Sequence, residues 1–403
     1  MHAITLLLLL FNQINSSSIV LIKGKVVDAQ SQRPVPFATV YLPEKGGTYA
    51  DSAGNFELLL NDLSSTDTLI ASSLGYETTY IPVSGTNFSD LTIPLQRKSE
   101  FLDTIIISDK EAMNKVIKAL EKIPDNFPTQ PFLMDGFYRQ THREDGHWCR
   151  LIEAQVDIYD ESYGPYRGTE LQEFLLVRDL RRSNVNEQNG FKHGDHLVDL
   201  LIENIVRYQG GRFTNPPATD KYEFAFDEST SSSVYVIQYT NKNLLEEIIR
   251  TGIIEIETGT FAIHRITELS YPNPNYKPSF NEPQDDWIFK EGFKEIKFVK
   301  KDEKMWLSEI HQYYKHDIFN FQFYGVEHAV EEYFDMWIVD VGFVKPEMNN
   351  GFTKQGNLYS KKYSYNSDKW NLEILKQHPL DIKIKNSLER FESLEEQFDQ
   401  NAQ

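Results

Sequence analysis

A long hairpin signal in the middle of the chain limits most strongly how this sequence can fold. Two strand-like segments, 132–142 and 147–160, lie on either side of Asp145-Gly146. This dipeptide favours the two-residue turn that joins antiparallel strands. Strands of this length need partners for their backbone N–H and C=O groups. The hairpin therefore predicts an antiparallel β-sheet, and an aromatic content of 13% also suits strands better than helical bundles.

Further strand segments extend this sheet toward the C-terminus. They are 232–239, 252–269 with a turn near Gly259, 293–314 with a turn at 301–304, and 331–341. Two helices are expected to interrupt the strands, one over 195–208 and a short one around 243–250, because glycines follow both segments. Long strands in a meander with few helices predict one large curved antiparallel sheet.

Shorter strands fill the first hundred residues. They are expected at 19–27, 37–42, 67–83 and 90–95, with a glycine break at Gly75. In one turn, the Asp51 side chain can bond to nearby backbone, while Gly54 accepts a positive φ before Phe56 enters the core. Turns at intervals of about 8 to 12 residues predict a β-sandwich.

Three stretches of this sandwich carry a family resemblance. They read "GKVVDAQSQRPVPFATVYL", "TYADSAGNFEL" and "LIASSLGYET". They resemble the carboxypeptidase-like regulatory domain, a transthyretin-like sandwich common in cell-envelope proteins of the Bacteroidota. The resemblance implies a scaffold without chemistry of its own. The stretches "DGFYRQ", "RLIEAQVDIYD" and "GTFAIHRI" of the larger sheet resemble an envelope domain of unknown function that often follows this module.

The beginning of the chain suggests export. Ile4 to Phe11 is an apolar run too short to span a bilayer and suited to the core of a secretory signal, with "NSSS" after it. A buried first strand is the alternative. No transmembrane segment is expected beyond this signal, so the protein is expected in the periplasm or associated with the outer membrane.

Two helices complete the predicted organisation. Ser108 and Glu111 have the spacing of a capping box, and the helix that they begin is expected to dock on a sheet and to end at Pro124. The acidic tail places Leu388, Phe391, Leu394 and Phe398 at helical spacing. Packing on its own domain or fraying is expected, and binding of a partner is the alternative. The whole chain divides into a signal peptide at 1–18, a β-sandwich at 19–97, a linker with a helix at 98–130, a large β-rich domain at 131–385 and a tail at 386–403.

Charge and cysteine content exclude several classes of function. The chain has 41 basic and 60 acidic residues and a formal charge of -19, which opposes binding to nucleic acid. Cys149 is the only cysteine, so an intramolecular disulfide and a centre with several thiolates are excluded. Its strand-like surroundings predict a buried, inert thiol instead of a nucleophile.

A metallopeptidase site is the main enzymatic alternative. His328 and Glu331 have the His-x-x-Glu spacing of zinc carboxypeptidases, with His378 as a conceivable third ligand. The strand-like location and the short spacing to His378 count against it. His193 and His196 are expected in a loop before a helix cap. Asp51 and Asp67 could bind calcium, although turn-forming aspartates explain them more simply.

The sequence therefore predicts no catalytic, cofactor-binding or metal residue and no cofactor. We expect a non-enzymatic secreted or periplasmic envelope protein, in which the sandwich is a docking or spacer module and the larger sheet binds a protein, peptide or glycan. The alternative is a carrier of an apolar acyl ligand on the concave face of the sheet, lined by aromatic side chains. A zinc-dependent, carboxypeptidase-like enzyme is the third reading.

Overall fold

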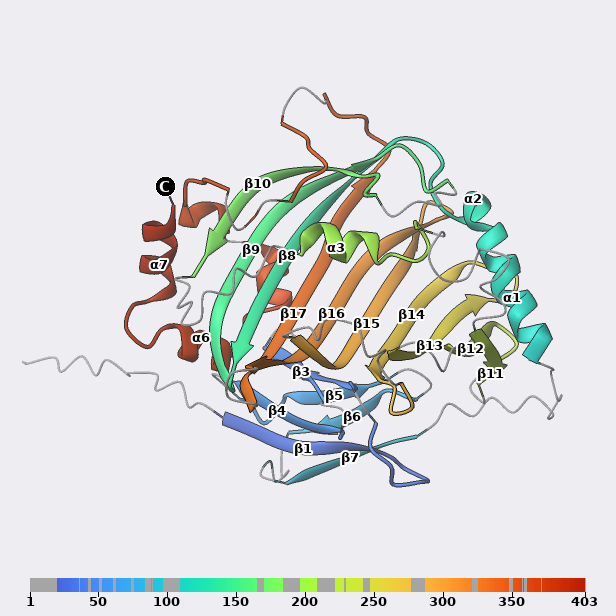
Figure 1. The fold of residues 1–403 in the computed structure, drawn as a ribbon, viewed down its shortest axis with the longest axis horizontal. Coiled ribbons are helices and arrows are strands. Elements are labelled where there is room, and N and C mark those ends of the chain that lie inside the picture. The colour runs from blue at the N-terminus through green and yellow to red at the C-terminus, as the bar shows by residue number, and fades with distance from the viewer. Residues whose placement is uncertain are drawn as a thin grey trace, which may run out of the picture. The chain divides into compact units, whose positions relative to one another are not determined.

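The chain folds into two compact units, one with strands β1–β7 and one with strands β8–β17 and the helices that pack on them (Figure 1). The computed structural model describes residues 20–35, 37–42, 45–50, 53–60, 63–73, 76–83, 88, 90–96, 109–164, 170–183, 196–208, 222–227, 230–241, 247–276, 287–320, 325–347, 351–356, 358, 361–370 and 372–402. The predicted signal peptide and the residues Asp51, Gly75, Ser108 and His193 lie outside this part. The mainly β fold class is confirmed.

The smaller unit is a sandwich of two sheets. One sheet has the order β4-β1-β7 and the other β3-β2-β5-β6. The strands are β1 (Val20–Asp28), β2 (Thr39–Leu42), β3 (Gly46–Tyr49), β4 (Asn55–Leu60), β5 (Thr68–Ser72), β6 (Thr79–Pro82) and β7 (Leu91–Leu95). Strand β1 pairs antiparallel with β4 and parallel with β7. Gly54 has φ +79° and Phe56 is buried, as the turn chemistry predicts.

The larger unit is built on one ten-stranded antiparallel sheet, which curves strongly (Figure 1). Its order is β10-β9-β8-β17-β16-β15-β14-β13-β12-β11. The strands are β8 (Phe132–Glu144), β9 (His147–Asp160), β10 (Phe174–Arg182), β11 (Tyr222–Phe226), β12 (Val234–Asn241), β13 (Ile248–Glu257), β14 (Ile263–Pro272), β15 (Trp287–Lys301), β16 (Lys304–Asn320) and β17 (Gly325–Gly342). The large antiparallel sheet is therefore confirmed.

The β8–β9 turn has the geometry that the sequence predicts. Asp145 has φ +47° and Gly146 has φ +81°, and a tight turn with two positive φ values suits the twist of antiparallel strands. The turns near Gly259 and at 301–304 also join neighbouring antiparallel strands. All three predicted hairpins are confirmed.

Three helices pack on what we call the inner face of the large sheet, the face with the side chains of Met134, Ile310 and Phe334. They are α1 (Asp109–Glu121), α2 (Ile123–Asn126) and α3 (Leu197–Ile202). Their buried apolar side chains belong to one core cluster with those of the sheet. Helix α1 contacts β11 and β13, and α3 crosses in front of β8, β17 and β16 (Figure 1). The predicted docking of the first helix on a sheet is confirmed.

The C-terminal segments pack on the opposite, outer face. They are η2 (Ser367–Trp370), α5 (Glu373–Gln377), α6 (Ile382–Leu388) and α7 (Leu394–Asn401). Trp370 joins Phe137 and Trp337 in a buried cluster. Leu394 and Phe398 are buried as well, so this part of the tail packs on its own domain, which was one of the expected alternatives.

Several predicted helices have other bounds. Segment 243–250 was expected to be helical, but β13 begins at Ile248 because the chain pairs there with β14. Helix α3 is shorter than the predicted 195–208. Pro124 lies in the first turn of α2 instead of ending α1, since proline needs no N–H there. Phe391 is 89% exposed between α6 and α7. None of the described helices combines the length and the hydrophobicity needed to cross a bilayer.

Candidate functional site

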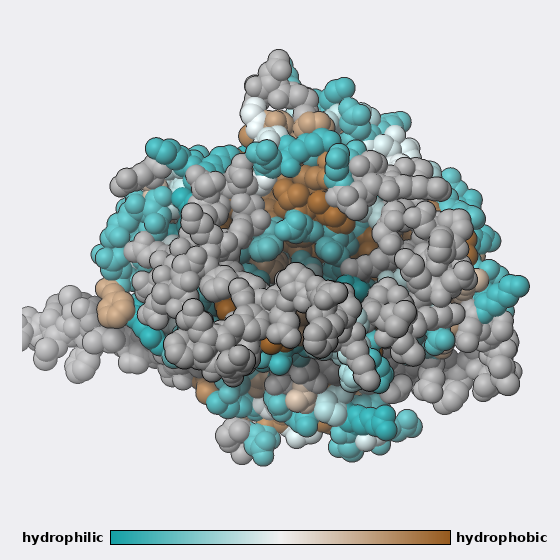
Figure 2. Space-filling model, in the orientation of Figure 1, coloured by the Kyte–Doolittle hydropathy of each residue, from teal (hydrophilic) through white to brown (hydrophobic). Residues whose placement is uncertain are grey.

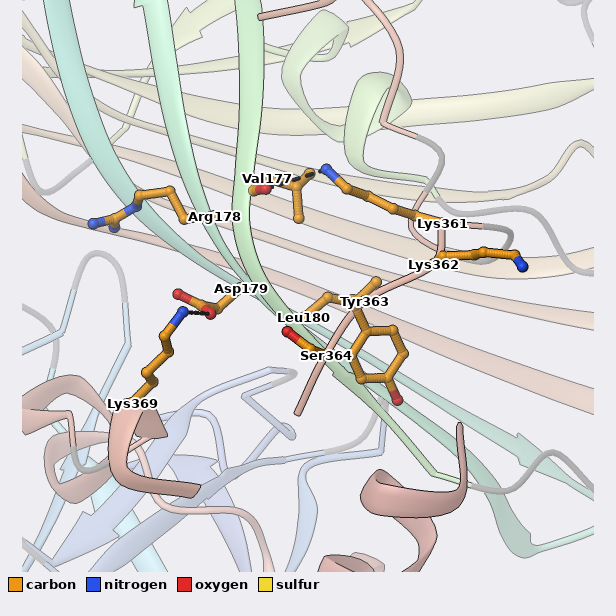
Figure 3. A pocket seen from close by; sticks show the side chains of 9 residues that line it. All are labelled: Val177, Arg178, Asp179, Leu180, Lys361, Lys362, Tyr363, Ser364 and Lys369. Carbon is orange, nitrogen blue, oxygen red and sulfur yellow. Dashed lines mark hydrogen bonds and ion pairs between the residues drawn. The ribbon is translucent and has the colours of Figure 1, made fainter. Parts of the chain in front are cut away.

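A pocket of about 400 Å³ opens at the end of the large sheet where β10 is the last strand (Figure 3). Residues Val177–Leu180 line one side, and residues 361–364 together with Lys369 line the other. Four of these side chains are cationic and one is a carboxylate. The lining therefore reverses the sign of the chain's overall charge.

The pocket lies where a second segment runs beside β10, and among the described residues these two segments pair through an isolated bridge at Leu175 and Thr353. Leu175 and Thr353 exchange backbone hydrogen bonds of 2.6 and 2.9 Å. Farther along, the Lys361 ammonium donates to the Val177 carbonyl at 3.1 Å, and the Arg182 backbone N–H donates to the Tyr363 hydroxyl at 3.3 Å. The pocket lies between Val177–Leu180 of β10 and residues 361–364 of this second segment (Figure 3).

A β-bulge sets the side chain positions on β10. Val177 pairs with Val156 and Asp179 with Gln155, so Arg178 is an extra residue without a partner in the ladder. A bulge re-aims the side chains around it. The Arg178 guanidinium pairs with Asp135 and, at 3.0 Å, with Asp157.

The four cations of the pocket are not equally available to a ligand. The Arg178 charge is balanced by two carboxylates, and the Lys369 ammonium lies 2.7 Å from Asp179. Lys361 bonds to a neutral carbonyl, and Lys362 is exposed. Burial lowers the pKa of Lys361, and an anion beside its ammonium would oppose this shift by stabilising the charged form. The pocket is suited to binding an anionic group.

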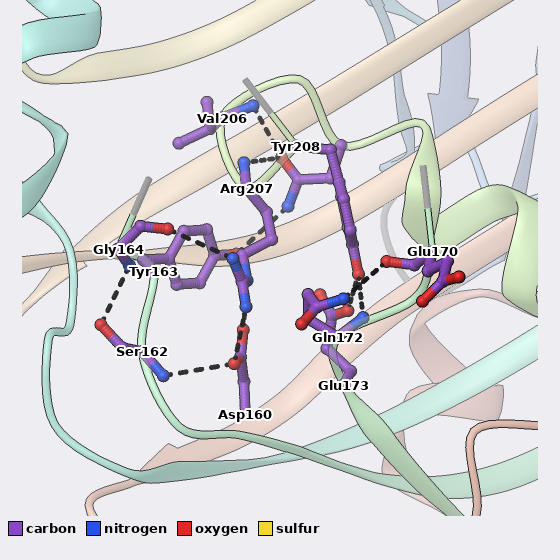
Figure 4. Close-up of polar contacts among 11 residues, drawn as sticks. Asp160, Ser162, Tyr163, Gly164, Glu170, Gln172, Glu173, Val206, Arg207 and Tyr208 are labelled. Carbon is purple, nitrogen blue, oxygen red and sulfur yellow. Dashed lines mark hydrogen bonds and ion pairs between the residues drawn. The ribbon is translucent and has the colours of Figure 1, made fainter. Parts of the chain in front are cut away.

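A buried polar network lies elsewhere in the larger unit (Figure 4). The Arg207 guanidinium contacts both oxygens of Asp160, at 2.5 and 3.0 Å, and the Tyr208 hydroxyl donates to Glu173. Burial, followed by the charge of Asp160, raises the pKa of Glu173 to about 7. The network ties the segment after α3 to β9 and β10. Sequence reasoning missed it because its members are scattered along the chain.

The structure separates His328 and Glu331, the two residues of the zinc motif that was considered as an enzymatic alternative. His328 and Glu331 are three apart on β17, and side chains alternate faces along a strand. The His328 Nδ1 atom lies 2.8 Å from an oxygen of Asp145, whereas Glu331 accepts a hydrogen bond from Arg143 at 3.2 Å. The His-x-x-Glu spacing therefore does not create a pair of converging ligands.

The other candidate residues also have structural partners. Asp67 accepts from Lys45 and from the Ser64 backbone, both at 2.7 Å. His196 directly precedes α3, as predicted, and its Nδ1 atom lies 3.0 Å from Asp199. Cys149 was expected to be buried but is half-buried, because it lies close to the end of the β8–β9 hairpin.

Comparison with known proteins identifies the smaller unit. Residues 22–107 match the family model of the CarboxypepD_reg-like domain. The predicted resemblance is therefore confirmed for this domain, which is followed by the larger mainly β unit. No curated protein matches the sequence.

Two solved structures show distant similarity to the chain. The first is a structure of lipovitellin, reported for its lipid–protein interactions. It has 5% sequence identity to this chain and a TM-score of 0.25, and the match covers 55% of this chain and 26% of the lipovitellin chain. The second is a putative membrane-associated protein of unknown function from Bacteroides fragilis NCTC 9343. It has 9% sequence identity and a TM-score of 0.16, and the match covers 80% of this chain and 95% of that chain. Both TM-scores are too low to support an argument about fold or function.

Proposed function

We propose that this protein is a non-enzymatic binding protein whose larger unit binds a carboxylate of an acidic peptide in the pocket beside β10. The CarboxypepD_reg-like domain then serves as a docking or spacer module. The observation that carries the proposal is the cationic lining of the pocket in a chain with a formal charge of -19. A positive pocket on an acidic protein concentrates anionic ligands locally and fixes their orientation.

The size and the polar lining of the pocket suit one chemical group of a ligand rather than a folded protein domain. A volume of about 400 Å³ lies within the range of small-ligand sites. Lys361 supplies an ammonium donor and Ser364 adds a hydroxyl, while the exposed Lys362 side chain extends away from β10 and adds positive charge at the rim (Figure 3). The carboxylate of a Glu or Asp side chain can accept hydrogen bonds from such donors.

Calorimetric titration of the full chain with a tri-glutamate peptide tests the proposal. The double variant Lys361→Gln, Lys362→Glu should weaken binding by about tenfold or more, roughly 1.4 kcal/mol. Lys300→Glu is the matched control, since Lys300 lies on β15, five strands from β10 in the sheet. Binding to the native chain should also weaken at high salt.

Two outcomes would overturn this proposal. One is the absence of saturable binding to the native chain, and the other is an equal loss in the control variant. A third titration, with tri-galacturonate, separates the sources of the carboxylate. Binding of this glycan without binding of the peptide would contradict the peptide assignment.

We also propose that the protein is exported and works in the cell envelope, on the basis of the apolar run from Ile4 to Phe11. Fractionation of the source cells, with the N-terminal mass of the mature chain, tests this. Recovery of the uncleaved chain in the cytoplasm would contradict it.

A carrier of an apolar acyl ligand is the second candidate function. Figure 2 shows apolar (brown) atoms in a hollow of the larger unit. Much of the apolar inner face nevertheless packs against α1, α2 and α3, so we rank the carrier second. Mass spectrometry of extracts from the purified protein tests it, because a carrier should release a stoichiometric acyl compound.

A further inference from the structure

The end of the β8–β9 hairpin brings three different metal-ligating side chains together. His142 and Glu144 are two residues apart on β8, so they share the inner face of the sheet. Across the hairpin, His142 pairs with Arg150 and Arg143 with Trp148. Cys149 is therefore the extra residue of a β-bulge, and a bulge can re-aim a side chain that regular alternation would place elsewhere.

The ligand atoms of these three residues lie close enough to share one ion. An imidazole nitrogen of His142, a carboxylate oxygen of Glu144 and the Sγ atom of Cys149 all lie within 4.8 Å of one another. The His142 Nε2 atom is 3.3 Å from Glu144 Oε1. Bond lengths of about 2.0 to 2.3 Å around a tetrahedral zinc ion place its ligand atoms roughly 3 to 4 Å apart. Small side chain rotations are enough to reach that geometry.

The donor set selects the class of metal. One nitrogen, one sulfur and one oxygen suit borderline ions such as Zn²⁺ and Co²⁺, whereas Ca²⁺ and Mg²⁺ prefer oxygen ligands only. Among the residues that the structure describes, this is the one group of three His, Cys, Asp or Glu side chains with such convergence. Three protein ligands leave a fourth position open for water or another ligand.

A second carboxylate faces the other nitrogen of the histidine. The Nδ1 atom of His142 lies 3.6 Å from Glu332 Oε1, and both side chains are almost fully buried. Metal-binding histidines usually present their second nitrogen to a carboxylate or carbonyl, which orients the ring and increases its basicity. Glu332 is placed by strand pairing, since it lies opposite His142 on β17. Glu332 lies outside the set of three ligands, and its contact with His142 has the arrangement expected around a metal site.

Access to the site is possible from one side. His142 is buried, whereas Glu144 and Cys149 are half-buried near the exposed Asp145-Gly146 turn. An ion could therefore reach the ligands from solvent without unfolding of the sheet. The buried imidazole of His142 is held in position, and the two partly exposed ligands leave a path by which the ion can enter.

We propose that His142, Glu144 and Cys149 form a Zn²⁺ or Co²⁺ site at the end of the β8–β9 hairpin, with Glu332 as the residue that orients His142. The site differs from the anion pocket beside β10 and from the His328 and Glu331 pair. It adds a metal to a protein for which the sequence predicts none, and it gives the single cysteine a specific role.

Titration of the reduced, untagged full chain with Co²⁺ tests the proposal directly. A thiolate bound to Co²⁺ gives a charge-transfer band in the near ultraviolet, and Cys149 is the only residue of the chain that can produce it. We expect one equivalent of Co²⁺ to bind with this band and to be displaced by Zn²⁺. Binding to the folded state should also raise the melting temperature.

Four variants make the test specific. Cys149→Ser should abolish the charge-transfer band, and Glu144→Gln should weaken the affinity. Glu332→Gln should reduce the affinity about 10- to 100-fold while keeping the band, as expected for a positioning residue. His328→Ala is the matched control from the same region and should change neither property. Circular dichroism of each variant without metal checks that it is folded.

Three results would overturn the proposal. They are the absence of stoichiometric binding to the native chain, a charge-transfer band that never appears, and unchanged affinity in both Cys149→Ser and Glu144→Gln. Loss of binding in His328→Ala alone would move the site to the other histidine.

Discussion

Arg207 and Asp160 form a two-point ion pair in the interior of the larger unit, with nitrogen–oxygen distances of 2.5 and 3.0 Å. Both side chains are almost completely shielded from water. Asp160 ends β9, and Arg207 lies in the turns after α3, so the pair fixes the position of that segment. Glu173 lies close enough to Asp160 for their charges to repel.

Asp160→Asn should destabilise the larger unit strongly, because it leaves the Arg207 charge buried without its counterion. Loss of one partner of a buried pair costs about 3 to 5 kcal/mol. The midpoint of urea denaturation measures the loss. Glu303→Gln, which removes a partner of the exposed Lys300, should leave the midpoint almost unchanged. Similar losses in the two variants would contradict the assigned difference in burial.

Glu173→Gln should stabilise the protein above pH 7 and have little effect at pH 4.5. Burial and the Asp160 charge raise the pKa of Glu173 to about 7 from an ordinary 4.5. Because the folded state holds this proton more tightly, the native chain loses stability as the pH rises from 4.5 through 7. The loss is on the order of 3 kcal/mol. Free energies of unfolding at pH 4.5 and 8 measure it, and parallel pH profiles for native chain and variant would refute it.

The pKa of His311 should lie well above that of an ordinary histidine. Burial alone would lower its pKa, but hydrogen bonds and charges from Asp335 and Glu309 raise the pKa to about 9. Its contribution to stability is therefore complete below the unfolded pKa of 6.5 and is lost as the pH rises through 9. An NMR titration of the imidazole, assigned by comparison with His311→Gln, measures this pKa. A midpoint close to 6.5 would show that the two carboxylates do not hold the proton.

Gly252→Ala should destabilise the sheet. A Cβ atom at this position would lie 2.1 Å from the Thr267 carbonyl oxygen and 2.5 Å from the Tyr239 ring. Relief of such contacts shifts the backbone, at a cost of about 1 to 3 kcal/mol. Gly259→Ala is the matched control, since nothing lies within 4 Å of its Cβ, and it should change stability by less than about 0.5 kcal/mol. Thermal melts of both variants give the comparison.

The hairpins of the larger sheet can be predicted from sequence because their information is local. Asp145-Gly146 adopts two positive φ values, and a strand-like segment lies on either side of this turn. The same holds for the sandwich, where Gly54 and Phe56 behave as the turn chemistry predicts. Neither inference requires knowledge of distant contacts.

Strand β13 shows where local pattern misleads. The segment 243–250 has apolar residues at helical spacing, yet Ile248 and the residues after it pair with β14, and the strand continues between β12 and β14. Tertiary pairing overrides intrinsic preference at such positions. The helix was predicted because Gly252 follows the segment, but Gly252 lies inside β13 and pairs there with Glu268.

The candidate sites depend on contacts that sequence spacing does not contain. Val177 and Lys361, which meet at the pocket, are 184 residues apart. The bulges at Arg178 and Cys149 are decided by which residues pair across the strands. An isolated Cys149 in a strand-like segment looks inert, and only the bulge shows that it approaches His142.

The chain that runs beside β10 also bears on aggregation. Strands at the ends of a sheet can pair with strands of other molecules. Here Thr353 pairs with the backbone of Leu175 on β10, and α1 contacts β11 at the opposite end of the sheet. A strand of another molecule can pair with Leu175 only after it displaces Thr353. Conditions that detach this short segment, without melting the sheet, should therefore be the ones that start fibril-like growth.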